Sequence, residues 1–291
     1  MKRPTISPLR YPGGKASLYS RLRPILRANN MSNGTYVEPY AGGAGAALGL
    51  LATGEVRRIV INDLDPTLYA FWVAVTKYSD KFSRLITEVD LTVDEWRRQK
   101  DVYVTSPRDD YLKLGFATFY LNRTNRSGVL NGGPIGGLDQ TGNYKIDARF
   151  NRAGLIERVR LIGVYSKRIV VSNCDGLEVI KRYARSEDVI IYADPPYFEK
   201  AGSLYMNSFK SSNHEELAAC LNSLDETRWL LTYDNVPQVA ELYPQRRRER
   251  FTLGYSAHRV IKANEIMVFS DALMLPEDQT LIPISAAIEP K

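Results

Sequence analysis

Short, β-prone apolar runs alternate along this chain with longer segments whose apolar residues recur at helical spacing. The runs are Thr35–Glu38, Arg58–Ile61, Arg168–Ser172, Asp188–Ala193 and Trp229–Tyr233. Apolar runs of this length, bounded by polar residues, are typical of buried strands. Since strands that alternate with helices form parallel sheets, the pattern predicts an α/β protein with a doubly wound, mainly parallel sheet.

Helical patterns and a late hairpin complete this predicted sheet. A glycine-rich turn, 39–45, separates the first strand from the apolar, helix-favouring run Ala46–Leu51. The second strand is followed by a helical pattern over 64–78, with apolar residues on one face. The segments Arg250–Leu253 and Glu265–Phe269 predict an antiparallel hairpin that closes the sheet.

The alternation stops between residues 79 and 167. Helical patterns there, including Tyr111–Leu121, lead into the glycine loop Asn131–Gly137. The simplest interpretation is a mostly helical subdomain, 79–167, inserted between the two parts of one domain, 1–78 and 168–291. The insertion is rich in side-chain types that reach phosphates and base edges: Arg123, Asn125, Arg126, Tyr144, Lys145, Arg149, Asn151 and Arg152.

Composition narrows the function only slightly. The chain has 291 residues, 44% of them hydrophobic and 25% charged, as expected for a globular protein with one large core. A formal net charge of +6 and a pI near 9.1 suit a polyanionic partner, because cations that neutralise phosphates release counterions. Charge alone does not identify nucleic acid as that partner.

Membrane proteins, secreted proteins and metalloenzymes are disfavoured by other features. The longest small and apolar run, 41–52, is shorter than the ~20 residues of a membrane span. The N-terminal residues lack the apolar stretch of a secretion signal, so we expect a cytoplasmic protein. The two cysteines and two histidines are too few and too scattered for a metal site, so we expect no metal.

The turn after the first strand has the character of a ligand-binding turn. A glycine turn that leaves a strand and opens a helix lets a ligand approach the backbone closely, and Glu38, Pro39 and Gly42 are its candidate binding residues. The acidic residue that ends the next strand, Asp63, is placed to bind ribose hydroxyls. The glycines do not fit G-x-G-x-x-G, because Leu48 stands at its last position, which disfavours a nicotinamide dinucleotide.

A second glycine turn lies near the N-terminus, at Pro12–Lys15. It does not form a phosphate-binding loop, because Leu9 and Ala16 stand where that motif needs glycine and Ser or Thr. What remains is a lysine, Lys15, held by a glycine turn close to Tyr11. Such a lysine is suited to meet a carboxylate, although an exposed terminal loop would have the same sequence.

The segment Asp194-Pro195-Pro196-Tyr197 directly follows a predicted strand, at the edge where parallel sheets bind ligands. Its chemistry suits a conjugated amine, such as that of adenine, whose lone pair is weakly nucleophilic. Asp194 can accept one amine hydrogen and the Pro195 carbonyl the other, while the prolines stiffen the loop. Such a loop localises the lone pair without a metal or a covalent intermediate.

Tyr197 adds a ring on which an unstacked base can lie, as an enzyme requires that flips its target out of the duplex. The reaction that fits is direct in-line transfer from a sulfonium donor, with catalysis by positioning and electrostatics. A proline-stiffened turn beside a core tyrosine is the purely structural alternative.

In combination, these motifs resemble the Dam-like class of adenine-N6 DNA methyltransferases. The resemblance covers nearly the whole chain and rests on these segments, in the family's order: Arg10–Lys15, Val37–Gly45, Ile61–Asp63 and Asp194–Tyr197. It implies the class I methyltransferase fold, which is Rossmann-like, and S-adenosylmethionine as the methyl donor. The acceptor that it implies is the exocyclic amine of a flipped adenine in double-stranded DNA.

The resemblance also assigns roles to cofactor residues. Tyr11 and Lys15 would contact the methionine part of S-adenosylmethionine, with Lys15 near its carboxylate. Asp63 would hold the ribose, and Asp175 resembles the family's acidic residue near the cofactor adenine. Asp194 is counted with the cofactor-binding residues as well as with the catalytic ones, which are Asp194, Pro195, Pro196 and Tyr197.

On the DNA side, Tyr120–Gly128 resembles the family's Asn-Arg stretch beside its target-recognition region. It implies DNA contacts from Arg123, Asn125 and Arg126. Tyr144–Asn151 resembles the start of the strand that follows the family's glycine loop. The recognition insert departs from the family pattern, so GATC, the family's best-known target, is not implied. A monomer is the family expectation, and a cognate restriction endonuclease is a functional partner that the sequence neither requires nor excludes.

Other functions remain open at this point. A cytosine-N4 methyltransferase is the main alternative, because it also methylates a conjugated, weakly nucleophilic amine. Serine is usual in that class where this chain has Asp194. A catalytically silent DNA-binding module would keep the same fold. Protein and RNA methyltransferases usually carry asparagine there. A cytosine C5 methyltransferase is excluded, because neither Cys174 nor Cys220 follows a proline.

Overall fold

The computed structural model describes residues 6–10, 18–198, 209–256 and 260–277. Within them, seven strands form one sheet in the order β3-β2-β1-β4-β5-β7-β6. The strands are β1 (Thr35–Glu38), β2 (Arg58–Asn62), β3 (Ile169–Ser172), β4 (Val189–Ala193), β5 (Trp229–Asp234), β6 (Arg247–Ser256) and β7 (Val260–Phe269). Neighbours are parallel except at β7, which is antiparallel to β5 and β6. The predicted doubly wound, mainly parallel sheet is confirmed.

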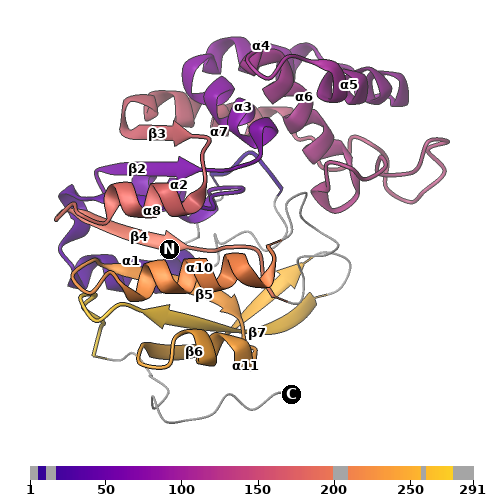
Figure 1. Cartoon of the computed structure of the whole chain (residues 1–291). Helices are drawn as coiled ribbons and strands as arrows, with labels where there is room; N and C mark the ends of the chain where they lie inside the picture. Colours follow the sequence, from indigo (N-terminus) through magenta and orange to yellow (C-terminus); the bar gives the residue numbers. More distant parts are fainter. Residues whose placement is uncertain (1–5, 11–17, 199–208, 257–259, 278–291) are drawn as a thin grey trace.

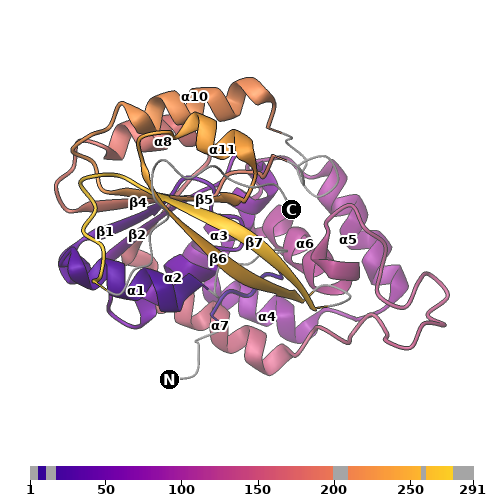
Figure 2. The ribbon, with the colours of Figure 1, turned by 90° about the horizontal axis from the view of Figure 1, so that it is seen from below.

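Both faces of the sheet are buried, because alternate strand residues enter two different hydrophobic clusters. In β1, Tyr36 belongs to one cluster and Val37 to the other, and in β4 the same holds for Tyr192 and Ile191. This explains the unbroken apolar runs of the sequence. Figure 2 shows the two layers of helices: α1 (Tyr19–Ala28), α2 (Gly45–Ala52) and α3 (Pro66–Lys77) on one face, α8 (Gly176–Tyr183), α10 (Ser211–Asn222) and α11 (Pro237–Leu242) on the other.

The segment predicted as a mostly helical insertion consists of helices and a long loop. Its elements are α4 (Ser79–Glu88), α5 (Val93–Thr105), α6 (Tyr111–Thr124) and α7 (Arg152–Val164), with short 3-10 turns η3 (Arg126–Gly128) and η4 (Ser166–Arg168); a further turn, η2 (Met31–Asn33), precedes β1. Helices α4, α6 and α7 pack on α3, and α5 packs on α6. The ring centroids of Phe71 in α3 and Phe119 in α6 lie 6.1 Å apart, and the centroid of Phe82 in α4 lies 5.3 Å from that of Phe119. One hydrophobic cluster therefore continues from the sheet into these helices.

The prediction of a strand at Tyr144–Asn151 is wrong. This segment forms turns, in which Ala148 donates to the Lys145 carbonyl at 3.0 Å and Phe150 donates to the Asp147 carbonyl at 2.8 Å. The Asn151 side chain caps α7, and Phe150 is buried against α6. A capping asparagine and an anchoring ring thus determine a local geometry that strand pairing would have disrupted.

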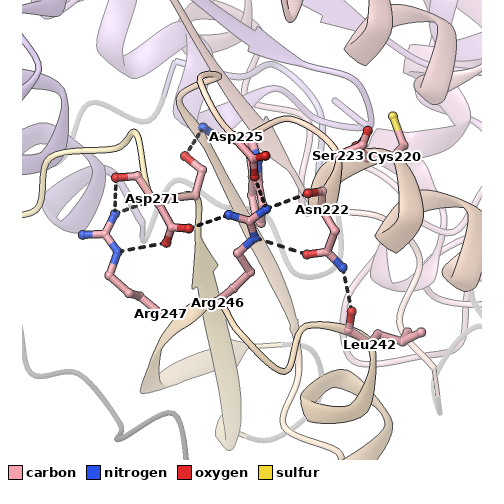
Figure 3. Close-up of polar contacts among 10 residues, drawn as sticks. Cys220, Asn222, Ser223, Asp225, Leu242, Arg246, Arg247 and Asp271 are labelled. Carbon is pink, nitrogen blue, oxygen red and sulfur yellow. Dashed lines mark hydrogen bonds and ion pairs between the residues drawn. The ribbon is translucent and has the colours of Figure 1, made fainter.

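The hairpin at the edge of the sheet is longer than predicted, with ten residues in each strand. Its charged flanks obscure the strand pattern in the sequence. Arg246, just before β6, fixes the hairpin through Asp271 at 2.7 Å and Asp225 at 3.0 Å, while its Nε donates to Asn222 at 3.2 Å (Figure 3). This network lies beside the beginning of β5, at the end of the sheet opposite its carboxyl edge.

Candidate active site

The carboxyl edge of the parallel strands brings together the acidic residues that the sequence singled out and one further acidic residue, Asp234. Glu38 ends β1, Asp63 follows β2, Asp194 follows β4, and Asp234 ends β5. Asp175 follows β3 and precedes α8. Strand order reverses between β1 and β4, and ligands of doubly wound sheets bind at such a switch point. These acidic residues therefore stand at the carboxyl edge of neighbouring strands, whose arrangement can be followed in Figure 1.

The turn after β1 is locked onto the end of β2. The Gly42 N–H donates to Asp63 Oδ2 at 2.9 Å, and the indole of Trp72 donates to the Gly42 carbonyl at 3.0 Å. Gly42 has a φ of +48°, a conformation that glycine adopts without steric cost. Because backbone and side chain hold this turn from both sides, it is a rigid surface for a ligand.

Glu38 is buried beneath this turn. One carboxyl oxygen accepts from the Ala47 N–H in the first turn of α2, at 3.1 Å. Burial and, to a smaller degree, the nearby charge of Asp194 raise the pKa of Glu38 to about 8. At neutral pH the Glu38 side chain is therefore mainly protonated, and it joins β1 to α2 without adding a full negative charge.

Asp63 accepts two backbone hydrogen bonds, from Gly42 to Oδ2 at 2.9 Å and from Asp65 to Oδ1 at 2.9 Å. Burial raises the pKa of Asp63 to about 6, against the lowering effect of those two donors. The carboxylate is thus ionised at neutral pH and oriented by the backbone. A negatively charged acceptor held in this way suits a pair of ribose hydroxyls.

Asn62 connects three of the loops at this edge. Its amide nitrogen donates to the Pro39 carbonyl and to the Cys174 carbonyl, each at 2.9 Å. The second contact precedes Asp175, whose exposed side chain caps α8 by accepting from Leu177 at 2.7 Å. Asn62 therefore sets the relative positions of the loops after β1, β2 and β3.

The carboxylate of Asp194 is held by a relay of hydroxyl groups. Thr232 Oγ1 donates to Asp194 Oδ1 at 2.8 Å, and the Tyr192 hydroxyl lies 2.8 Å from Thr232 Oγ1. Because the single hydroxyl hydrogen of Thr232 points to Asp194, Tyr192 is the donor in the second bond. Burial raises the pKa of Tyr192 well above its usual value, so this donor stays protonated.

Tyr197 is buried in this structure, with 9% of its surface exposed. Its hydroxyl interacts with Glu265 of β7, which is fully buried. Burial, together with the charges of Asp194 and Glu265, raises the pKa of Tyr197 well above its usual value, so the phenol is neutral. Glu265 thereby fixes the hydroxyl end of the tyrosine ring that the sequence assigns to the target base.

The end of the Asp194–Phe198 loop is held by β5 and α10. The Phe198 N–H donates to Asp234 Oδ1 at 3.2 Å, and the Phe198 ring stacks on His214 with centroids 3.8 Å apart. His214 Nδ1 lies 2.8 Å from the Tyr233 hydroxyl. Burial lowers the pKa of His214, which is therefore neutral and can stack on an aromatic ring without a charge to solvate.

Four of these positioning residues were missed by the sequence interpretation: Thr232, Glu265, His214 and Asp234. The first two had a signal, since each is a polar residue in or beside an otherwise apolar strand, where a side chain without a partner is costly. His214 had none, because a single histidine in a helix indicates no particular contact.

Replacement of Thr232 by valine should lower kcat about ten- to hundredfold, as expected when a charged acceptor loses a hydrogen bond. Valine keeps the shape of threonine and removes the hydroxyl, which donates to Asp194 and accepts from Tyr192. Steady-state kinetics with Thr232→Val and Thr232→Ser separate the two roles, because serine restores the hydroxyl and should restore most of kcat. Equal losses in both variants would show that packing, and not the hydroxyl, is what matters.

The predicted DNA-contact residues are in different environments. Arg126 is exposed, whereas Asn125 is fully buried. The Asn125 amide donates to the carbonyls of Val129 and Leu130 at 2.8 and 3.0 Å, and its oxygen accepts from the Trp96 indole at 2.7 Å. In this structure Asn125 therefore holds the loop that follows α6, and Arg126 presents its charge to the outside.

The segment beside the N-terminal glycine turn is attached to α6. The Asn122 amide oxygen accepts from the Arg10 N–H at 2.7 Å, and its nitrogen donates to the Arg10 carbonyl at 2.7 Å. Tyr11 and Lys15 lie outside the described residues. The attachment of Arg10 nevertheless joins the chain that leads to them to the helix that carries Arg123.

Comparison with known proteins identifies the family. Residues 11–260 match the family model of D12 class N6 adenine-specific DNA methyltransferases. A relative, the type II methyltransferase M.MjaIII of Methanocaldococcus jannaschii, is 26% identical over 209 residues, which are 65% of this chain and 68% of that protein.

Two solved structures are also similar to this chain. One is an uncharacterized protein from Listeria monocytogenes serotype 4b, with a TM-score of 0.36 and 12% identity over 88% of this chain and 68% of that one. The other is the rRNA methyltransferase aviRa from Streptomyces viridochromogenes, with a TM-score of 0.39 and 14% identity over 88% of this chain and 84% of that one. The fold is assigned on strand order and connectivity.

The sheet and its ligand-binding edge define a class I, Rossmann-like methyltransferase fold. Since the family model spans most of the sequence, the chain belongs to the D12 class of N6 adenine-specific DNA methyltransferases. The predicted family is confirmed, and with it an adenine-specific DNA methyltransferase. Membership of this family implies the use of S-adenosylmethionine. In the described part of the chain, no helix is long and apolar enough to span a membrane.

Proposed function

We propose that this protein transfers the methyl group of S-adenosylmethionine to the N6 amine of an adenine that is flipped out of double-stranded DNA at a specific site. The catalytic loop in this proposal is Asp194-Pro195-Pro196-Tyr197. The observation that carries it is the position of Asp194, directly after β4 at the switch point, with its carboxylate oriented by Thr232.

The residues at the carboxyl edge fit S-adenosylmethionine, which supplies an electrophilic methyl group when bound. Asp63 is an ionised acceptor for the ribose hydroxyls, and the rigid turn with Glu38, Pro39 and Gly42 lets the cofactor approach the backbone. Acidic side chains also favour a sulfonium cation. Asp175 is proposed near the cofactor adenine, Tyr11 and Lys15 at its methionine part, and no metal is required.

Each residue of the catalytic loop has a separate task. Asp194 accepts one hydrogen of the amine and the Pro195 carbonyl accepts the other, which localises the nitrogen lone pair toward the methyl group. Transfer would form the new N–C bond as the methyl–sulfur bond of the donor breaks, which leaves S-adenosylhomocysteine, and Asp194 would accept the proton that the amine loses. Pro196 stiffens the loop. Tyr197, held at its hydroxyl by Glu265, offers its ring to the flipped base.

The helices from α4 to α7, with the loop between α6 and α7, are proposed as the target-recognition subdomain, 79–167. The remaining chain, 1–78 and 168–291, is the catalytic domain in this proposal. Arg126 is assigned to DNA contact, Arg123 to a phosphate and Asn125 to the support of the loop. A cytoplasmic monomer fits an enzyme that methylates one strand at each encounter, and a cognate restriction endonuclease would be a functional rather than a physical partner.

A transfer assay tests the proposal. Purified protein is incubated with labelled S-adenosylmethionine and unmethylated genomic DNA, and the digested nucleosides are separated. We expect the label in N6-methyladenine. Label in N4-methylcytosine would support a cytosine-N4 enzyme, and absence of label from DNA despite cofactor binding would support a silent DNA-binding module. Parallel reactions with RNA and protein test those substrates.

A further inference from the structure

Four arginines gather where α6, α7 and the N-terminal segment meet. Arg123 interacts electrostatically with Arg10, Arg149 and Arg158, and Arg10 also interacts with Arg149. Among the described residues, none of these four arginines forms an ion pair, and Arg123 makes no hydrogen bond. The Nε atom of Arg123 is buried without a partner.

The arginines are brought together by a rigid framework. Arg10 lies beside α6 because Asn122 forms hydrogen bonds with both its backbone N–H and its backbone carbonyl. The Arg10 guanidinium donates to the Asn125 carbonyl at 3.1 Å. Arg158 donates from α7 to the Ser7 carbonyl at 3.1 Å.

Arg149 is positioned by its neighbour in the chain. Phe150 packs against α6, with its ring centroid 5.5 Å from that of Phe119 and 6.0 Å from that of Tyr120. Three segments far apart in the sequence thus place like charges together through contacts that the guanidinium groups themselves do not provide. Repulsion alone would disperse exposed arginines, so the framework maintains the cluster.

This arrangement is costly in the protein alone. Burial and, to a smaller degree, the charges of Arg10, Arg158 and Arg149 together lower the pKa of Arg123 to about 9. A buried cation normally has a carboxylate partner, and removal from water is poorly compensated without one. An anion that enters the cluster would relieve both the desolvation and the repulsion. Guanidinium groups match the oxygen geometry of a phosphate especially well.

We propose that Arg10, Arg123, Arg149 and Arg158 form a single preorganised site for a phosphodiester of the DNA strand bound along α6 and α7. This proposal rests on the proposed function and deepens it, since it adds Arg10, Arg149 and Arg158 to Arg123 as one phosphate-binding unit. The site lies beside the loop held by Asn125 and beside the segment that leads to Tyr11. A phosphate fixed there would set the register of the DNA between recognition loop and catalytic loop.

The decisive variant is Arg123→Met, which replaces a partly buried cation by an apolar chain of similar length. If the cluster binds a phosphate, the variant should bind a fluorescein-labelled 24-base-pair duplex about tenfold more weakly or worse. The slope of log affinity against log salt concentration should fall by about one. The melting temperature of the free protein should stay the same or rise, because an unpaired buried charge has been removed. A purely structural arginine predicts the reverse, with a lower melting temperature and unchanged DNA affinity.

Two further variants keep the test decisive. Arg149 is exposed, so Arg149→Ala should fold normally and weaken DNA binding in the same way. Arg160, which is exposed two residues after Arg158 on α7, provides the matched control, and Arg160→Ala should retain wild-type affinity. If Arg149→Ala and Arg160→Ala lost the same DNA affinity, net charge alone would explain the effect. The proposed phosphate site would then be wrong.

A measurement of cofactor binding tests the remaining alternative, in which the four arginines bind the carboxylate of the cofactor. Titration with S-adenosylhomocysteine should give the same affinity for wild type and Arg123→Met. Loss of that affinity with intact DNA binding would assign the cluster to the carboxylate of the cofactor and overturn the proposal. Failure of the proposed function is a different result: the wild type would then bind the duplex, with the Arg123 dependence described above, and transfer no methyl group to adenine.

Discussion

Replacement of Asp194 by alanine is expected to lower the rate of methyl transfer roughly a thousandfold, the scale of loss when a preorganised electrostatic contact to the reacting group is removed. The carboxylate is held by Thr232 in the free protein, so its geometry requires little rearrangement when the base arrives. Single-turnover methylation of DNA, with the enzyme in excess over the DNA, measures the chemical step directly. The affinity for cofactor should change only a few-fold, because Asp63 and the turn at Gly42 are unaltered.

The control for this experiment is Asp101→Ala, which removes an exposed acidic residue of α5. It should retain the wild-type rate. Asp194→Asn should be intermediate, since an amide oxygen still accepts one hydrogen bond while the negative charge is lost. If Asp194→Ala kept more than half of the wild-type single-turnover rate, the assignment of the catalytic loop would be wrong.

Much of the sheet could be predicted from the sequence because its strands are buried on both faces. A strand such as β4, Val189–Ala193, must be apolar at every position, and such a run is distinctive. The turns that follow also carried signals, since glycine at 42 and proline at 195 and 196 restrict the backbone. Local backbone chemistry and burial therefore determined what was predictable.

The groups that orient the catalytic loop could not be predicted because they come from distant segments. Thr232, Glu265 and His214 belong to β5, β7 and α10, and only the folded sheet brings them beside Asp194 and Tyr197. A polar residue in a buried strand indicates that a hydrogen-bond partner is required, but the sequence does not identify that partner.

The hairpin and the loop before α7 show two further limits. Strands β6 and β7 pair over ten residues at one edge of the sheet, and their charged residues hide the alternation of strand positions in the sequence. In the segment before α7, a resemblance to relatives predicted a strand, whereas Asn151 and Phe150 produce a capped helix and a buried anchor. Local capping and packing of this chain overrode the family pattern.

Asp63 provides the second large effect, on the binding of cofactor. Replacement by asparagine should weaken binding of S-adenosylhomocysteine about ten- to hundredfold, because hydroxyl donors lose a charged acceptor. Isothermal titration over a range of pH adds a sharper test. The pKa of Asp63 in the free protein is raised to about 6, so the protonated form, a poorer acceptor, accumulates as pH falls below that value.

The wild-type affinity should consequently be constant above about pH 7 and decline by up to tenfold for each unit below about pH 6, as linkage of binding to one ionisation requires. The affinity of Asp63→Asn should be low and independent of that ionisation. Glu178→Gln, which changes an exposed acidic residue of α8, is the matched control and should follow the wild type. The melting temperature of each free protein identifies any loss caused by unfolding. An Asp63→Asn variant that kept both the affinity and the pH dependence of the wild type would remove Asp63 from the cofactor site.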